Sequence, residues 1–175
     1  MRFPSLHRRL ALAFRNFNPA SRLRRTFLRR SVVSGYAAFN RRDLDLMLVR
    51  YAPHAEFLYS PGEQTLGLDG TFVGPDEIRR GIEMLFDGWD RQEEPFCVID
   101  LGDRALVLSF ARTRGQSSGI QLEHEFSDLI TIGHDGLIVH EQAWFSWEQG
   151  LAAAGLGPET VPLPARPVDS TVTSN

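Results

Sequence analysis

The second half of the chain contains four long segments in which apolar and polar residues alternate, and this pattern constrains the fold most. The segments are joined by the short turns "GDR", "GQSSG" and "GHDG". Alternation with a period of two is typical of β-strands, and such short turns join antiparallel neighbours. Residues 95–147 therefore predict a mostly antiparallel sheet. Its four strands are "PFCVIDL", "RALVLSFARTR", "IQLEHEFSDLITI" and "LIVHEQAWFSW".

Helical patterns precede this sheet. Apolar residues three to five apart predict an amphipathic helix over residues 21–40, with Ser21 as its cap. A second helix is predicted in "RDLDLMLVRYAP", with Asp43 as the N-cap and Pro53 as its end. The clearest helix is "GPDEIRRGIEMLFDGW", because Pro75 suits a first helical position and acidic residues follow it.

Between the second and third helices, "HAEFLYS" alternates like a short strand. Residues 60–74 are rich in glycine and predict a loop with a short edge strand. Helices that precede an antiparallel sheet indicate an α+β fold. If this sheet curves around the helices, the hollow between them is a natural ligand site.

The composition is that of a soluble globular protein. A chain of 175 residues with 42% hydrophobic residues is long enough for one domain with a real core. The net charge of −3 gives the whole chain no bias toward nucleic acid. No apolar run approaches the ~20 residues that span a bilayer, and we expect a cytoplasmic protein. The single cysteine, Cys97, excludes a disulfide within the chain and is expected to pack as a small hydrophobe.

The charge is unevenly distributed along the chain. Residues 1–30 hold nine arginines and no acid, and the first acid is Asp43. The basic face of the first helix can contact phosphate or an anionic membrane surface; the alternative is an ordinary solvated face. We predict that residues 1–28 are a basic helical extension. Residues 157–175, which hold four prolines and no aromatic residue, predict a disordered tail.

The segments "AAFNRRDLD", "YAPHAEF", "GPDEIR" and "HDGLIV", in this order, resemble the SnoaL-like polyketide cyclase family. That family lies within the superfamily of nuclear transport factor 2, ketosteroid isomerase and limonene epoxide hydrolase. The resemblance covers residues 29–156. It implies a cone-shaped α+β barrel, with a strongly curved sheet covered by about three N-terminal helices. It also implies a homodimer formed through the outer face of the sheet.

The functional positions of the superfamily are matched only in part. The oxyanion-holding tyrosine of steroid isomerases falls on Gly35, and their general base falls on Tyr59. Their protonated aspartate falls on Asp128. The carboxylate that SnoaL-like proteins often carry in the last strand falls on Ala143. Without the base no proton is abstracted, so steroid isomerase chemistry is disfavoured. The Asp–Arg–Asp arrangement of the epoxide hydrolases has no clear counterpart.

Asp128, His124 and Glu141 are the candidate catalytic residues, since they lie on strand faces that the resemblance turns toward the cavity. A carboxylate in an apolar cavity has a raised pKa and can donate a proton or hold an oxyanion. Alternatively, Asp128 holds the pocket together through hydrogen bonds, and the other two face solvent at the rim of the sheet. The predicted substrate-binding residues are Phe39, Tyr51, Tyr59, Trp89, Phe126, Ile130 and Phe145.

No cofactor or metal is expected. The five histidines lack HxH and HxxxH spacing, and no glycine-rich phosphate loop occurs. Trp144 and Trp147 are expected on the outer face of the sheet. There they form a dimer interface as exposed aromatic residues, or they pack against the N-terminal helix.

Three functions follow from this sequence. The first is a domain that binds a small hydrophobic, polycyclic or polyketide-like molecule and acts as a cofactor-independent acid/base cyclase, isomerase or hydrolase. The second is a non-catalytic ligand-binding or protein-interaction module of the same fold, which Gly35, Tyr59 and Ala143 favour. The third is an interaction protein whose basic N-terminal helix docks on an anionic partner.

Overall fold

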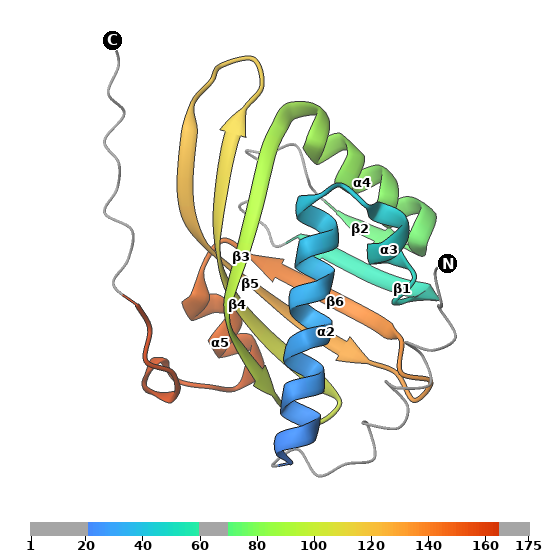
Figure 1. The fold of residues 1–175 in the computed structure, drawn as a ribbon, viewed down its shortest axis with the longest axis vertical. Helices are drawn as coiled ribbons and strands as arrows, with labels where there is room; N and C mark the ends of the chain where they lie inside the picture. The colour runs from blue at the N-terminus through green and yellow to red at the C-terminus, as the bar shows by residue number, and fades with distance from the viewer. Residues whose placement is uncertain (1–20, 60–69, 165–175) are drawn as a thin grey trace.

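The computed structural model describes residues 21–59 and 70–164 and shows one curved sheet with helices on both sides (Figure 1). The elements in chain order are α2 (Arg22–Asn40), α3 (Leu44–Leu48), β1 (Tyr51–Tyr59), β2 (Thr71–Val73), α4 (Pro75–Gly88), β3 (Trp89–Asp100), β4 (Arg104–Gly115), β5 (Gln121–Ile132), β6 (Ile138–Trp144), α5 (Trp147–Ala154) and a 3₁₀ turn (Pro158–Thr160).

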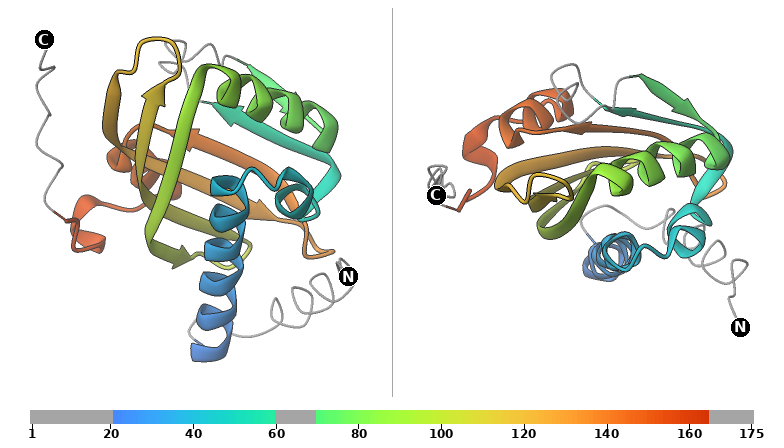
Figure 2. Two further views of the ribbon diagram at one scale, coloured as in Figure 1. Left: turned by 45° about the horizontal axis from the view of Figure 1, so that its top comes forward. Right: turned by 90° about the horizontal axis from the view of Figure 1, so that it is seen from above.

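The six strands lie in the order β2-β1-β6-β5-β4-β3. The β1–β6 pair is parallel, and the other neighbours are antiparallel. The sheet curves without closing into a barrel, so β2 and β3 remain its edges. Helices α2, α3 and α4 lie on the concave side, and α5 covers part of the outer face (Figure 2). The predicted α+β class, the mostly antiparallel sheet and the three N-terminal helices are confirmed.

The second helix is shorter than its apolar pattern predicts. Asp43 caps it as expected, since its side chain accepts a hydrogen bond from Leu46 N at 3.1 Å. The helix ends at Leu48, however, and Pro53 lies inside β1 rather than after a helix. The proline is tolerated because the register with β6 shifts between Tyr51 and Glu56, where no ladder hydrogen bond is needed from it.

Strand β3 begins six residues earlier than expected, at Trp89 instead of residue 95. Its first half carries polar residues on both faces, so no apolar alternation marks it in the sequence. Pairing with β4 nonetheless extends from Trp89 to Asp100, with a bulge after Pro95. This first half brings Arg91 and Glu93 to the concave face, and both side chains are buried there.

The outer face of the sheet has its own apolar core under α5. Trp147 is 1% exposed, and its indole Nε1 donates to the carbonyl of Ser109 at 2.8 Å. Trp144 is also buried in this cluster, together with Leu151. The prediction of exposed aromatic residues here is therefore wrong, and so is packing against the N-terminal helix, because α5 folds back over them. A homodimer stays a prediction.

The structure describes only part of the predicted N-terminal extension (residues 1–28) and of the predicted C-terminal tail (residues 157–175). Helix α2 crosses the predicted boundary at residue 28, and residues 1–20 lie outside the described ranges. Of the predicted tail, residues 157–164 are described, and Val161 packs into the outer core; residues 165–175 lie outside. Among the helices in the described ranges, none is long and apolar enough to cross a membrane.

Candidate active site inside the curved sheet

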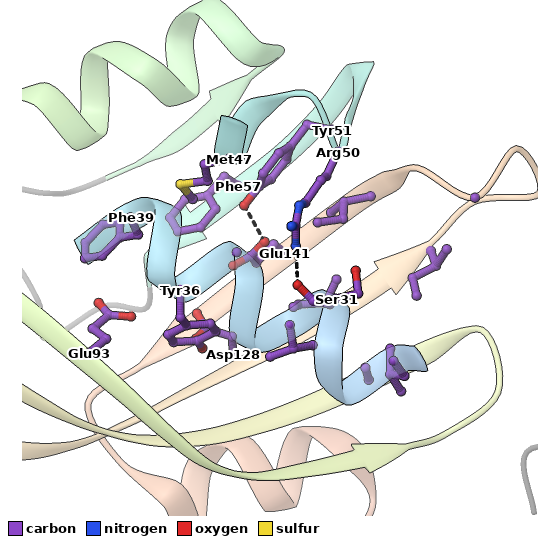
Figure 3. Close-up of a pocket in the computed structure, with 18 of the residues that line it drawn as sticks. Ser31, Tyr36, Phe39, Met47, Arg50, Tyr51, Phe57, Glu93, Asp128 and Glu141 are labelled. Atoms are coloured by element: carbon purple, nitrogen blue, oxygen red, sulfur yellow. Dashed lines mark hydrogen bonds between the residues drawn. The ribbon is translucent and has the colours of Figure 1, made fainter. Parts of the chain in front are cut away.

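A cavity of about 150 Å³ lies between α2 and the concave face of the sheet. Its walls are mostly apolar and aromatic, and they come from α2, α3, α4 and all strands except β2 (Figure 3). The polar groups concentrate on the strands that form its floor. The aromatic residues in the lining are Phe27, Tyr36, Phe39, Tyr51, Phe57, Tyr59 and Phe126.

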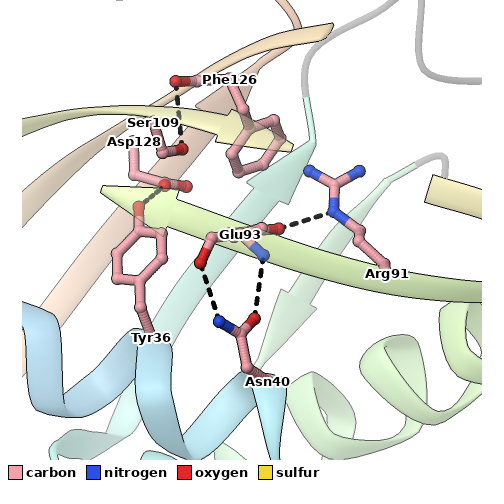
Figure 4. A network of polar contacts seen from close by, with 7 residues as sticks. All are labelled: Tyr36, Asn40, Arg91, Glu93, Ser109, Phe126 and Asp128. Carbon is pink, nitrogen blue, oxygen red and sulfur yellow. Dashed lines mark hydrogen bonds and ion pairs between the residues drawn. The ribbon is translucent and has the colours of Figure 1, made fainter. Parts of the chain in front are cut away.

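The first polar pair on the floor joins α2 to β5. The hydroxyl of Tyr36 donates a hydrogen bond to Asp128 Oδ2 (Figure 4). Burial raises the pKa of Asp128 well above its ordinary value, and the carboxylates of Glu141 and Glu93 raise it further. The hydrogen bond from Tyr36 and the positive charge of Arg91 oppose this rise without cancelling it. Asp128 is therefore the buried acid of the cavity.

The second pair joins β1 to β6. The hydroxyl of Tyr51 donates to Glu141 Oε2 at 2.6 Å (Figure 3). Burial raises the pKa of Glu141 to about 7, although the hydrogen bond from Tyr51 lowers it in part. A carboxyl group with this pKa gains and loses its proton near neutral pH.

Glu93 adds a third carboxylate on β3. Its Oε1 accepts a hydrogen bond from Arg91 Nε at 2.6 Å, and the two side chains form a buried ion pair. Asn40, the last residue of α2, bonds to the backbone carbonyl and amide of Glu93 at 2.8 and 2.9 Å (Figure 4). These contacts fix the end of the helix against the strand that carries the third carboxylate.

Arg91 is wholly buried, with 0% of its side chain exposed, and is held by aromatic rings. Its guanidinium lies 4.2 Å from the ring centre of Phe126 and 5.2 Å from that of Phe145, close enough for cation–π attraction. Its two Nη atoms have no hydrogen-bond partner. The positive charge is paired with Glu93 and also acts directly on Asp128, whose pKa it lowers in part.

His124 lies beside this cluster, with its ring centre 4.6 Å from that of Phe145. Burial and, as a smaller cause, the charge of Arg91 together lower the pKa of His124 to about 3. The imidazole is therefore neutral at physiological pH. It packs as an aromatic ring, and its buried Nε2 has no partner.

The cavity opens toward the first turns of α2. There its lining includes Arg24 and Phe27 on the helix, Asp103 in the β3–β4 turn and Gly136 in the β5–β6 turn. Asp103 is exposed, so the cavity reaches the surface at this end. Arg24 holds the helix to the sheet here, because its Nε donates to the Asp100 carboxylate at 2.6 Å.

The strand register places the two pKa-shifted carboxylates on one face. Asp128 pairs with Ala143, and Ile130 pairs with Glu141, so the two carboxylates are diagonal neighbours on β5 and β6. Such neighbours have Cα atoms roughly 7–8 Å apart. Two carboxyl groups with raised pKa values, one of which titrates near pH 7, can thus act on two atoms of one small ligand.

Most of the predicted site residues line the cavity, but three do not. Those in the lining are Asp128, Glu141, Phe39, Tyr51, Tyr59, Phe126 and Ile130. His124 and Phe145 lie outside it in the cluster around Arg91, and Trp89 follows α4 at the start of β3. Neither candidate carboxylate faces solvent, because Asp128 and Glu141 are both buried.

Sequence analysis did not identify Tyr36, Glu93 and Arg91 as site residues. Tyr36 lies in the apolar stripe of the first helix, and nothing in the stripe separates a core tyrosine from one that meets a carboxylate. By alignment, the tyrosine position of the isomerases falls on Gly35, one residue before the tyrosine that contacts Asp128. Glu93 could have been found only by extending β3 back through polar residues, where alternation gives no signal.

Within residues 21–59 and 70–164, no group of three or more histidine, cysteine, aspartate or glutamate residues is arranged to hold a metal ion. Cys97 is half-buried against the outer core, and burial raises the pKa of its thiol. It lies on the far side of the sheet from the carboxylates, consistent with a packing role.

The fold and the site together define a class: a cone-shaped α+β domain with buried carboxylates in a cavity that opens at one end. Residues 32–141 match the SnoaL-like domain, and the chain belongs to that family. No curated protein matches the sequence.

Several solved structures share the fold of this chain. An NTF2-like protein of unknown function from Burkholderia pseudomallei is 26% identical, with 70% of this chain and 93% of that chain covered and a TM-score of 0.62. TerC, co-crystallized with polyporic acid, is 23% identical, with 73% and 95% covered and a TM-score of 0.60. The epoxide hydrolase/cyclase-like enzyme SalBIII is 13% identical, with 68% and 90% covered and a TM-score of 0.55.

Proposed function

We propose that this protein binds a small, mainly hydrophobic ring compound that carries an oxygen substituent. We further propose that it transfers a proton from one atom of this ligand to another without a cofactor. The observation that carries the proposal is the presence of two buried carboxyl groups in one apolar cavity: Asp128, whose pKa burial raises well above its ordinary value, and Glu141, whose pKa is raised to about 7. An apolar wall with few polar groups is typical of sites for small organic ligands.

The two carboxyl groups would have different roles, Glu141 as the base and Asp128 as a hydrogen-bond donor. Glu141 in its ionised form takes a proton from a carbon next to the carbonyl of the ligand. The electron pair of that C–H bond moves toward the carbonyl oxygen, which becomes an enolate. The protonated carboxyl of Asp128, held in place by Tyr36, donates a hydrogen bond to that oxygen. In a β,γ-unsaturated carbonyl compound, Glu141 returns the proton to the γ-carbon, the double bond shifts and the conjugated isomer forms. In a compound with a second carbonyl, the enolate carbon attacks that carbonyl and closes a ring, and the alkoxide formed takes the proton from Glu141.

The size of the cavity limits the ligand. An enclosed apolar volume of about 150 Å³ accepts a molecule on the order of benzene. A larger polycyclic or polyketide-like ligand would extend through the mouth beside Arg24 and Asp103. Two proteins of the same fold support an organic ligand: TerC was co-crystallized with polyporic acid, and SalBIII has a role in pyran ring formation.

The test has a binding arm and a chemical arm. Thermal shift with a panel of one- to three-ring ketones, quinones and phenols, against matched hydrocarbons, measures binding. We expect the oxygenated compounds to raise Tm, and we expect Asp128→Leu to abolish their advantage. In D₂O, NMR then follows deuterium uptake next to the carbonyl. Glu141→Gln should slow this uptake by about 10²–10⁴-fold, while the exposed control Glu94→Gln should leave it unchanged. No shift with any compound would refute the proposal.

A second function is favoured by one observation: each carboxylate already has a partner. Asp128 is bonded by Tyr36, Glu141 by Tyr51 and Glu93 by Arg91, as expected for a cavity built for stability. A non-catalytic ligand-binding module would show ligand-dependent shifts in Tm with no deuterium uptake above the buffer rate in any variant.

A further inference from the structure

The charges in the first turn of α2 are opposite to those that usually stabilise the N-terminus of a helix. The N-terminus of a helix carries a partial positive charge that favours acidic residues. The first turn of α2 instead holds Arg22, Arg24 and Arg25 and no acid, and Ser21 makes no side-chain cap. Arg24 is neutralised by Asp100. Arg22, which is exposed, adds positive charge at an end that is already positive, so an anionic partner would stabilise this end.

The outward face of α2 combines cations with exposed apolar residues. Arg22, Arg29 and Arg30 are exposed. Leu23 is 63% exposed and Val33 is 44% exposed on the same side of the helix. The first turns of α2 also extend past the β3–β4 turn, away from the body of the sheet (Figures 1 and 2). A basic face with interspersed apolar residues is typical of helices that lie on a bilayer surface.

The rest of the sequence strengthens the charge contrast. Residues 1–30 contain nine arginines and no acid, whereas all 22 acidic residues follow residue 42. Residues 1–20, which precede α2 in the chain, contain four arginines interleaved with six phenylalanine and leucine residues. An RNA site could use the arginines and the phenylalanine rings, but it has no need of the leucines or of the exposed Leu23 and Val33 on α2, so these aliphatic residues favour a lipid surface over nucleic acid.

We propose that α2 docks on an anionic lipid surface and that the hydrophobic ligand enters the cavity from that surface. The same helix supplies both parts: its outer face carries the arginines, and its inner face lines the cavity through Phe27, Leu28 and Tyr36. The mouth beside Arg24 lies at the end of α2 that carries the exposed arginines. The acidic Asp103 also lies at this mouth, but the exposed Arg22, Arg29 and Arg30 leave this end of the helix with a net positive charge. Only the entry route depends on the proposed function; docking does not.

The experiment is co-sedimentation of the full chain with vesicles of phosphatidylcholine containing 30% phosphatidylserine, against pure phosphatidylcholine. We expect binding to the anionic vesicles alone and its loss in 0.5 M NaCl. The triple variant Arg22→Gln, Arg29→Gln, Arg30→Gln should bind about a hundred-fold more weakly. A matched triple variant, Arg41→Gln, Arg80→Gln, Arg114→Gln, removes equal charge from other surfaces and should retain binding. Leu23→Gln should weaken binding at constant charge.

Three results would overturn the proposal: no binding to anionic vesicles, equal loss of binding in both triple variants, or tighter binding to a single-stranded RNA than to vesicles at equal phosphate concentration. Circular dichroism of each variant checks that it is folded. Because vesicle binding requires no ligand in the cavity, failure here leaves the proposed function standing. Failure of the ligand panel, in turn, leaves docking standing.

Discussion

The hydroxyl of Tyr36 on α2 is bonded to the carboxylate of Asp128 on β5, although the two residues are 92 positions apart in the chain. The contact ties the helix that covers the cavity to the strand that forms its floor. It also limits the rise in the pKa of Asp128, because the hydroxyl stabilises the ionised form that burial disfavours.

Replacing Tyr36 by phenylalanine should raise the pKa of Asp128 further, because the bond that stabilises the ionised carboxylate is lost. The change leaves the ring and its packing in place. Carbon-13 NMR of the aspartate side chains across a pH series would follow the carboxyl group. An Asp128 pKa that falls, or stays the same, in Tyr36→Phe would show that the hydroxyl does not stabilise the charged form.

Glu141 should make the protein less stable as the pH rises from about 4.5 to about 7. Its pKa rises from 4.5 to about 7 on folding, so in this range the folded state holds a proton that the unfolded state has lost. The free energy of unfolding from this group therefore falls with pH, by at most about 1.4 kcal/mol per pH unit. Urea unfolding at several pH values should show this slope reduced in Glu141→Gln and unchanged in Glu94→Gln. Equal slopes in all three proteins would contradict the assignment.

His124 should remain neutral between pH 5 and pH 8. Its folded pKa of about 3 lies below the ordinary 6.5, so its contribution to stability is present above pH 6.5 and is lost as the pH falls toward 3. Proton NMR of the imidazole C2–H, with free imidazole as an internal reference, should show no shift over the range. A midpoint near 6.5 would place His124 in solvent. Between about pH 4.5 and 6.5 this contribution opposes that of Glu141.

Removing only one partner of the buried Arg91–Glu93 ion pair should lower the free energy of unfolding far more than removing both charges. Arg91→Met leaves Glu93 without a cation in a dry site and should cost about 3–5 kcal/mol of unfolding free energy. Arg91→Met with Glu93→Gln should recover most of this loss. Chemical denaturation of both variants provides the comparison. A double variant as unstable as the single one would mean that stacking on Phe126 and Phe145, rather than charge, explains the loss.

Gly150 should not tolerate alanine, because α5 lies too close to β5. A Cβ atom at this position would lie 2.3 Å from Ser127 Oγ and 2.7 Å from its Cβ. Gly150→Ala should therefore destabilise the protein by about 1–3 kcal/mol. Gly88→Ala is the matched control, since a Cβ there meets nothing within 4 Å, and it should be neutral or slightly stabilising. Thermal unfolding measures both, and similar effects would argue against close packing of α5.

Several features of the fold followed from short-range patterns. The period-two alternation after residue 95 predicted the long strands, and Pro75 with Asp76 and Glu77 predicted the start of α4. The errors arose where two patterns compete. Residues 49–52 continue the apolar stripe of α3, but pairing with β6 draws them toward the sheet, as the bond from Ile138 N to the carbonyl of Arg50 shows.

The candidate site was only partly accessible from the sequence. Asp128 and Glu141 were identified because they lie among apolar residues on strand faces that the resemblance to the SnoaL-like family turns toward the cavity. Their partners were not identified, because Tyr36 and Tyr51 meet them across 92 and 90 residues of chain. Glu93 lies in a polar stretch whose burial depends on its pairing with β4 and on the end of α2.

The sequence alone therefore determined the α+β class, the antiparallel strands and the two carboxylates, because periodicity and turn residues act over a few neighbours. The tertiary structure alone decided which groups surround those carboxylates, how far burial shifts their pKa values and where the cavity opens. These properties depend on distances between segments remote in the chain, and desolvation and Coulomb energies follow those distances rather than the order of residues.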